Sequence, residues 1–169
     1  SALENYDRPE IAAEELPADA YRDDVAANLA VAERWVTEHS DTEFDFFLPP
    51  YSILFWDKVI REGRTEAVFA AIRQAGQTLL QYDNVKFYGY LMDPEIVTNL
   101  DNYCDYIHHS GGVCREILAM LQREEGRLTE ENLEETLANW REFVVHYDYD
   151  QFWDERFWIQ WNAEHAAAP

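Results

Sequence analysis

The chain has 169 residues, of which 47% are hydrophobic and 15% aromatic, a composition too apolar for a disordered protein. Its 34 Asp and Glu residues outnumber 13 Lys and Arg, and the net charge of −21 argues against nucleic acid or an anionic membrane as a partner. Neutral sugars, acyl esters and basic proteins remain compatible with this charge. We find no apolar run long enough for a transmembrane helix and expect no signal peptide at the N-terminus.

The first half of the chain predicts two helical stretches and two strands. Residues 1–20 are acidic and contain two prolines, so we expect a loop or arm. Residues 21–39 carry apolar side chains at helical spacing. An aromatic run at 44–48 ends at a pair of prolines, which cannot continue a ladder, and this predicts a buried strand. A helical stretch within residues 59–80 and a second strand at 85–90 follow.

The second half predicts a polar loop and further helices. The loop spans residues 93–112, and a helix at 113–123 follows, with Gly126 as its C-cap. A further helix opens at residues 129–132. The aromatic segment at 147–161 is expected to pack on the domain body, with a carbohydrate-stacking platform as the alternative.

The order of these elements predicts an α/β fold with parallel strands and flanking helices. Only two strands are visible, so the sheet looks incomplete. We divide the chain into an N-terminal arm at 1–20, the C-terminal portion of an α/β domain at 21–125, and a helical, aromatic-rich extension of the same domain at 126–169.

Asp105 and His108 form the candidate chemical pair. They follow the second predicted strand, at the carboxyl end where open α/β sheets place their sites. A carboxylate three residues before a histidine can orient the imidazole, whose other nitrogen then faces a nucleophile supplied elsewhere. Taken alone, this spacing is more often a surface hydrogen bond or a cap than a catalytic dyad.

Three segments together resemble the C-terminal half of bacterial SGNH/GDSL-like hydrolases of the large cell-surface type found in Gram-positive bacteria. These are Phe46 to Ser52, Asn99 to Tyr103 and Asp105 to His108. The resemblance implies a flavodoxin-like three-layer α/β/α domain in which Asp105 is the orienting acid and His108 the general base. It also implies that Pro50, Tyr51, Ser52 and His109 shape the substrate pocket.

The same resemblance implies a function, a location and partners. The parent domain would be a serine esterase or O-acyltransferase of cell-envelope or carbohydrate acyl esters, outside the cytoplasm or at the cell surface, with no cofactor and no metal. The nucleophile would come from an upstream half of the same domain, because none of the four serines lies in a Gly-Asp-Ser-type block. The isolated chain would then be inactive.

The alternative reading is a non-catalytic, acidic α/β interaction module with a vestigial dyad. The aromatic tail would then serve association. Separately, because the sheet looks incomplete, its unpaired edges and the aromatic tail should leave apolar surface exposed, and we expect a homodimer through either surface. Cys104 and Cys114 are expected to be small buried side chains or a local disulfide, because their spacing to the neighbouring histidines is irregular for a zinc site.

Overall fold

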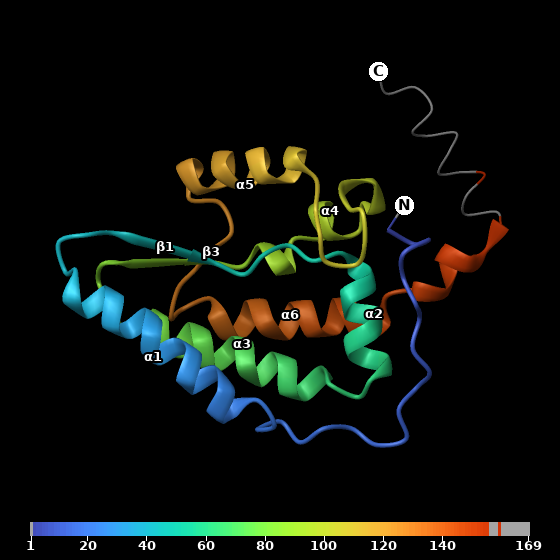
Figure 1. Ribbon diagram of the computed structural model, residues 1–169, viewed down its shortest axis with the longest axis horizontal. Coiled ribbons are helices and arrows are strands. Elements are labelled where there is room, and N and C mark those ends of the chain that lie inside the picture. The colour runs from blue at the N-terminus through green and yellow to red at the C-terminus, as the bar shows by residue number, and fades with distance from the viewer. Residues whose placement is uncertain (1, 156–158, 160–169) are drawn as a thin grey trace.

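The computed structural model describes residues 2–155 and 159, and it shows a small sheet with helices on both of its faces (Figure 1). Helices α1, α3 and α6 lie on one face, α5 lies on the other, and the short α2 stands at one end. The elements in chain order are α1 (Arg22–Glu38), β1 (Phe44–Phe47), α2 (Ile53–Arg61), α3 (Thr65–Leu79), β2 (Val85–Tyr88), α4 (Pro94–Val97), α5 (Gly111–Arg123), β3 (Arg127–Leu128) and α6 (Leu133–His146). None of the described helices is long and apolar enough to cross a bilayer.

The sheet has the order β1-β2-β3 and is mixed. β1 and β2 run parallel, with Phe44 opposite Val85 and Phe47 opposite Tyr88, as the α/β pattern predicts. β3 is antiparallel to β2, with Leu128 opposite Phe87, so the expectation of parallel strands alone is wrong. A strand of two residues shows no alternation that a sequence pattern could detect. The fold is therefore mixed α/β, and a flavodoxin-like arrangement is not confirmed.

Two helices, α2 and α3, replace the single helical stretch predicted within residues 59–80. The chain turns between them at Gly63. This glycine has φ of +63°, and a Cβ placed on it would lie 2.6 Å from the backbone oxygen of Glu14 in the N-terminal arm. The predicted C-cap also differs, because α5 ends at Glu124 in the left-handed conformation. Gly126, with φ of +70°, instead turns the chain into β3.

The main core forms where three helices meet below the sheet. The indole of Trp56 on α2 is fully buried against Phe69 on α3, with ring centroids 5.2 Å apart, and against Trp140 on α6 at 6.0 Å. A second, smaller cluster fills the space between the sheet and α5. Its buried members are Tyr88, Tyr90, Ile96, Val113, Ile117 and Met120.

The N-terminal arm is irregular, as expected, and it is tied to the helices. Arg8 donates to both carboxylate oxygens of the buried Asp57 at 2.9 and 3.0 Å, and the hydroxyl of Tyr6 donates to the same carboxylate. The aromatic segment after α6 packs on this region: Phe152 is buried, and the guanidinium of Arg8 lies 4.1 Å from the ring centroid of Trp153. The later aromatics, Phe157, Trp158 and Trp161, lie outside the described residues.

Candidate functional site

Asp105 organises the loop between α4 and α5 by accepting three hydrogen bonds. Its Oδ1 accepts from the backbone N–H of Ile107 at 2.9 Å and of His108 at 2.7 Å. Its Oδ2 lies 2.6 Å from Nδ1 of the His108 ring. The sequence prediction that the carboxylate reaches this ring is therefore confirmed. The same contacts make Asp105 a side-chain cap of a turn, which is the ordinary structural role of an aspartate at this spacing.

Competing effects set the pKa of the Asp105 carboxyl. Burial raises it, whereas the backbone hydrogen bonds from His108 and Ile107 and the contact with the His108 ring lower it, and the pKa lies below its usual range. For the Asp105 carboxylate to accept a hydrogen bond from Nδ1 of His108, this nitrogen must carry a proton. In the neutral ring, Nε2 is then a hydrogen-bond acceptor, and the part of the chain that the structure describes provides it with no hydrogen-bond partner.

Replacing Asp105 with asparagine should make stability less dependent on pH in acid. A carboxyl with a depressed folded-state pKa stabilises the fold above its unfolded pKa, and this contribution is lost as pH falls through the folded pKa. We expect Asp105→Asn to lower the free energy of unfolding by about 1 kcal/mol at neutral pH and by much less near pH 3. Urea unfolding of both proteins between these pH values measures the difference. If the difference in unfolding free energy between the two proteins stays constant down to the lowest pH, the Asp105 carboxylate does not stabilise the fold through its charged form.

His108 stands at the rim of a surface hollow of about 310 Å³ just beyond the carboxyl end of β1. The hollow is lined by Pro49, Tyr51, Ile107, His108 and His109. Of the residues predicted to shape a pocket, Tyr51 and His109 line it. Pro49 and Ile107 also line the hollow. They were not predicted as pocket residues from the sequence, although each is adjacent to a residue that was predicted. The lining surface is mostly apolar, and His108, His109 and Tyr51 are the lining side chains that carry polar groups.

Pro50 and Ser52 are placed differently from the other predicted pocket residues, because both are buried and support the loop from below. The carbonyl oxygen of Pro50 accepts a 2.8 Å hydrogen bond from the hydroxyl of Tyr103. The backbone N–H and the hydroxyl of Ser52 both donate to the carbonyl oxygen of Tyr106, at 3.1 and 2.9 Å. These bonds join the start of α2 to the loop that carries His108.

The described residues place no hydroxyl or thiol in hydrogen-bond contact with the His108 ring. Ser52 is fully buried and already donates to Tyr106, and Ser110 begins α5 as its N-cap residue. The thiol of Cys104 donates to the backbone oxygen of His108 at 3.3 Å, which leaves the imidazole untouched. The loop therefore orients a histidine without bringing a nucleophile to it.

The expectation of buried or disulfide-bonded cysteines is wrong. Cys104 and Cys114 are both exposed and free. Their positions explain this: Cys104 lies on the outer side of the loop, and Cys114 lies on the exposed side of the first turns of α5, with its sulfur 3.7 Å from Nδ1 of His109. Among the residues that the structure covers, no three His, Cys, Asp or Glu side chains are grouped so as to hold a metal ion.

The comparisons with known proteins give two distant relatives. Each is named "UPF0735 ACT domain-containing protein", one from Lacticaseibacillus casei and one from Lacticaseibacillus paracasei, and each is 24% identical to this chain over 90 residues. The match covers 53% of this chain and 62% of each relative, so the chain spans less than two thirds of the curated relatives it matches. No family model matches the chain, and no solved structure matches it significantly.

These relatives contradict the resemblance to SGNH/GDSL-like hydrolases. Their names refer to an ACT domain and not to a hydrolase, an esterase or an acyltransferase, so the assignment to an ester-processing enzyme of the cell envelope is wrong. The resemblance depended on short segments whose residues have local structural roles. Asp105 caps a turn and Ser52 anchors the loop from α2, and such arrangements recur in unrelated folds. The chemical role of the Asp105–His108 pair itself stays a prediction.

Proposed function

We propose that this chain is a regulatory, non-enzymatic module that binds a small molecule in the hollow beside His108. The observation that carries the proposal is the 2.6 Å contact that fixes His108 through Nδ1 and leaves Nε2 as an acceptor at the rim. The names of the two relatives support a non-enzymatic role, since they refer to a domain and not to a reaction.

The chemistry of the hollow selects the class of ligand. An accepting Nε2 requires a ligand that donates an O–H or N–H, and the apolar surfaces of Pro49, Tyr51 and Ile107 favour a hydrocarbon or aromatic body. The net charge of −21 gives the surroundings a negative potential that disfavours anions. The ligand is therefore a neutral or cationic molecule with a donor group attached to an apolar part.

Three probes of similar size test this selection. Benzyl alcohol and benzylamine each carry a donor on an aromatic body, whereas benzoate carries only acceptors. Nuclear magnetic resonance titration at about pH 8, where an ordinary imidazole is neutral, should show shifts of His108, Ile107 and His109 with both donors and none with benzoate. Equal binding of benzoate, or shifts elsewhere on the protein, would refute the proposed ligand class.

The matched variants are His108→Ala and His146→Ala. Both histidines are exposed and contact an acidic side chain, but His146 lies at the end of α6, outside the residues that line the hollow. Loss of one hydrogen bond should weaken binding of benzyl alcohol roughly fivefold in His108→Ala and leave it unchanged in His146→Ala. Unchanged affinity in both variants would show that Nε2 of His108 does not bind the ligand.

A further inference from the structure

β1 is an edge strand whose outer side has no pairing partner among the described residues. The backbone N–H groups of Phe44 and Leu48 donate to the carbonyl oxygens of Asn84 and Tyr88 on the β2 side. Because parallel ladders use alternate residues, the backbone groups of Asp45 and Phe47 point away from β2. A free edge of this kind is a template for an additional strand.

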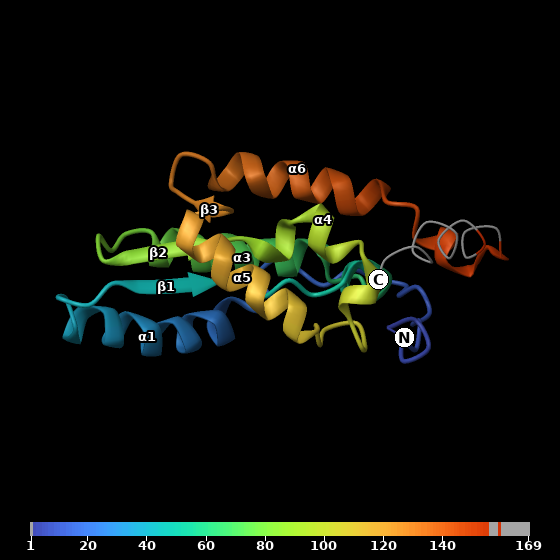
Figure 2. The same ribbon diagram turned by 90° about the horizontal axis from the view of Figure 1, so that it is seen from above.

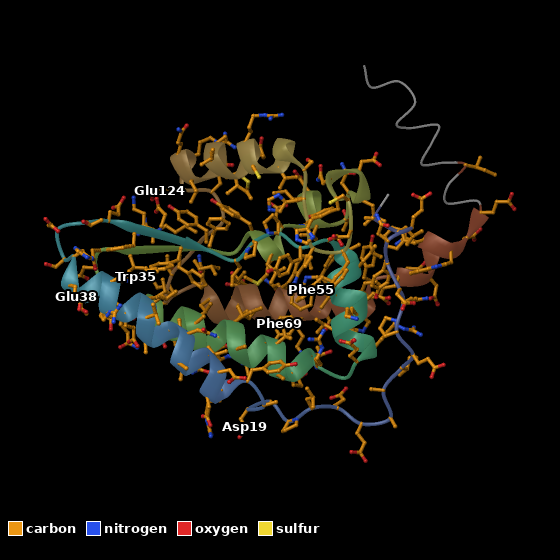
Figure 3. The ribbon with its side chains drawn as sticks, in the orientation of Figure 1. Asp19, Trp35, Glu38, Phe55, Phe69 and Glu124 are labelled. Carbon is orange, nitrogen blue, oxygen red and sulfur yellow. The ribbon has the colours of Figure 1, made fainter. Side chains whose placement is uncertain are left out.

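Helix α1 provides an apolar surface beside this edge. It lies below the sheet and extends beyond β1, as Figures 1 and 2 show together. Ala27, Val31 and Trp35 recur every four residues on its exposed face, and Val31 and Trp35 remain 46% and 48% exposed. Figure 3 places Trp35 near the end of α1 where the chain turns towards β1. A strand added to β1 would lie beside α1 on this side of the sheet.

The charges at this edge determine the kind of strand that fits. Glu38, Asp41 and Asp45 are exposed and have no ion pair among the described residues. The lysine beside them, Lys86, is already shared between Glu43 and Glu124 at 3.0 and 2.7 Å. A second copy of this chain would bring the same carboxylates and a further charge of −21 to the contact. A basic partner would instead neutralise them.

We infer that the outer edge of β1 and the exposed face of α1 form a docking surface for an extended segment of a basic protein. This edge surface consists of Ala27, Val31, Trp35, Asp45 and Phe47. The segment pairs with the backbone of Asp45 and Phe47. Because side chains alternate along a strand, its apolar side chains lie over α1, on the side where Phe44 and Phe46 join the core, and its lysines or arginines lie on the side of Asp45.

A short peptide of alternating valine and lysine is the probe for this surface. Titration followed by nuclear magnetic resonance should shift the amides of Asp45 and Phe47 and the indole N–H of Trp35. Binding should also slow hydrogen exchange of both amides. Binding should weaken at least about threefold between roughly 0.05 and 0.2 M salt, because the attraction between exposed charges is screened. A peptide that leaves these amides unchanged would overturn the inference.

Two control peptides separate strand pairing from simple charge attraction. The same valine–lysine peptide with alternate backbone nitrogens methylated keeps its charge but cannot complete a ladder, and it should not bind. A valine–glutamate peptide can pair but should be repelled. Equal binding of the methylated peptide would show that only the acidic surface attracts the probe, and this would overturn the docking surface.

The matched protein variants are Val31→Asp and Val145→Asp. Both valines are exposed on helices, but Val145 is on α6, which lies along the opposite edge of the sheet from α1 (Figure 2). Val31→Asp should weaken the valine–lysine peptide about tenfold and Val145→Asp should not change it. Sedimentation of the peptide-free chain completes the test: a dimer that Val31→Asp dissociates would assign the surface to a second copy and refute a basic partner.

Discussion

Replacing Arg8 with alanine should lower the free energy of unfolding by about 3–5 kcal/mol, because it leaves a buried carboxylate without its counter-charge. The side chain of Asp57 is 2% exposed, and Arg8 binds both of its oxygens through a planar fork. Arg8 also donates to Asp150 at 2.7 Å and stacks on Trp153. It therefore joins the N-terminal arm, α2 and the segment after α6 at one point.

Urea unfolding followed by circular dichroism measures this loss, and two further variants define its cause. Arg22→Ala removes an exposed arginine that pairs with Asp19 and Asp23, and it should change the free energy of unfolding far less than Arg8→Ala does, because exposed ion pairs are screened by solvent. Adding Asp57→Asn to Arg8→Ala removes the uncompensated charge and should recover part of the stability. If the double variant is less stable than Arg8→Ala alone, burial of the charge is not the source of the loss.

Local sequence patterns were sufficient to predict the elements that have a clear apolar periodicity or a clear terminating residue. The apolar spacing along residues 21–39 predicted α1, and the proline pair after Phe47 and Leu48 marked the end of β1. The break between α2 and α3 was not predicted, because it depends on the arm: Glu14 occupies the space where a side chain at position 63 would lie. β3 was missed because its two residues are defined only by pairing with β2.

At the candidate site, too, a contact between residues close in sequence could be predicted, whereas features that depend on tertiary packing could not. The contact of Asp105 with His108 is local, and the spacing of three residues predicted it correctly. The exposure of Cys104 and Cys114 depends on which side of the loop and of α5 faces the sheet, and residue type alone predicted the opposite. The family assignment failed for a related reason, since a cap and a helix start were interpreted as parts of a catalytic centre.

Replacing Trp56 with alanine should cost about 3–5 kcal/mol, mostly because the cavity left by the indole cannot close. The ring is completely buried and lies edge-on to Phe55 and Trp140, with centroid separations of 5.4 and 6.0 Å. It therefore joins α2 to α6, and through Phe69 it also joins α2 to α3. Thermal and urea unfolding measure the loss, and a change below about 1 kcal/mol would contradict this account of the core.

Trp35→Ala is the matched control, because it removes the same side chain from a site that is 48% exposed on α1. Because about half of its indole is buried, Trp35→Ala should lower the free energy of unfolding by roughly 1–2 kcal/mol, clearly less than Trp56→Ala. The two variants should also differ at the candidate site. Ser52, the N-cap residue of α2, donates to the carbonyl oxygen of Tyr106, so a loosened α2 should speed hydrogen exchange in the loop from Tyr103 to His109. Trp35→Ala should leave that loop unchanged, since α1 makes no hydrogen bond to it in the described structure. Faster exchange in both variants would mean that the loop responds to global stability and not to α2.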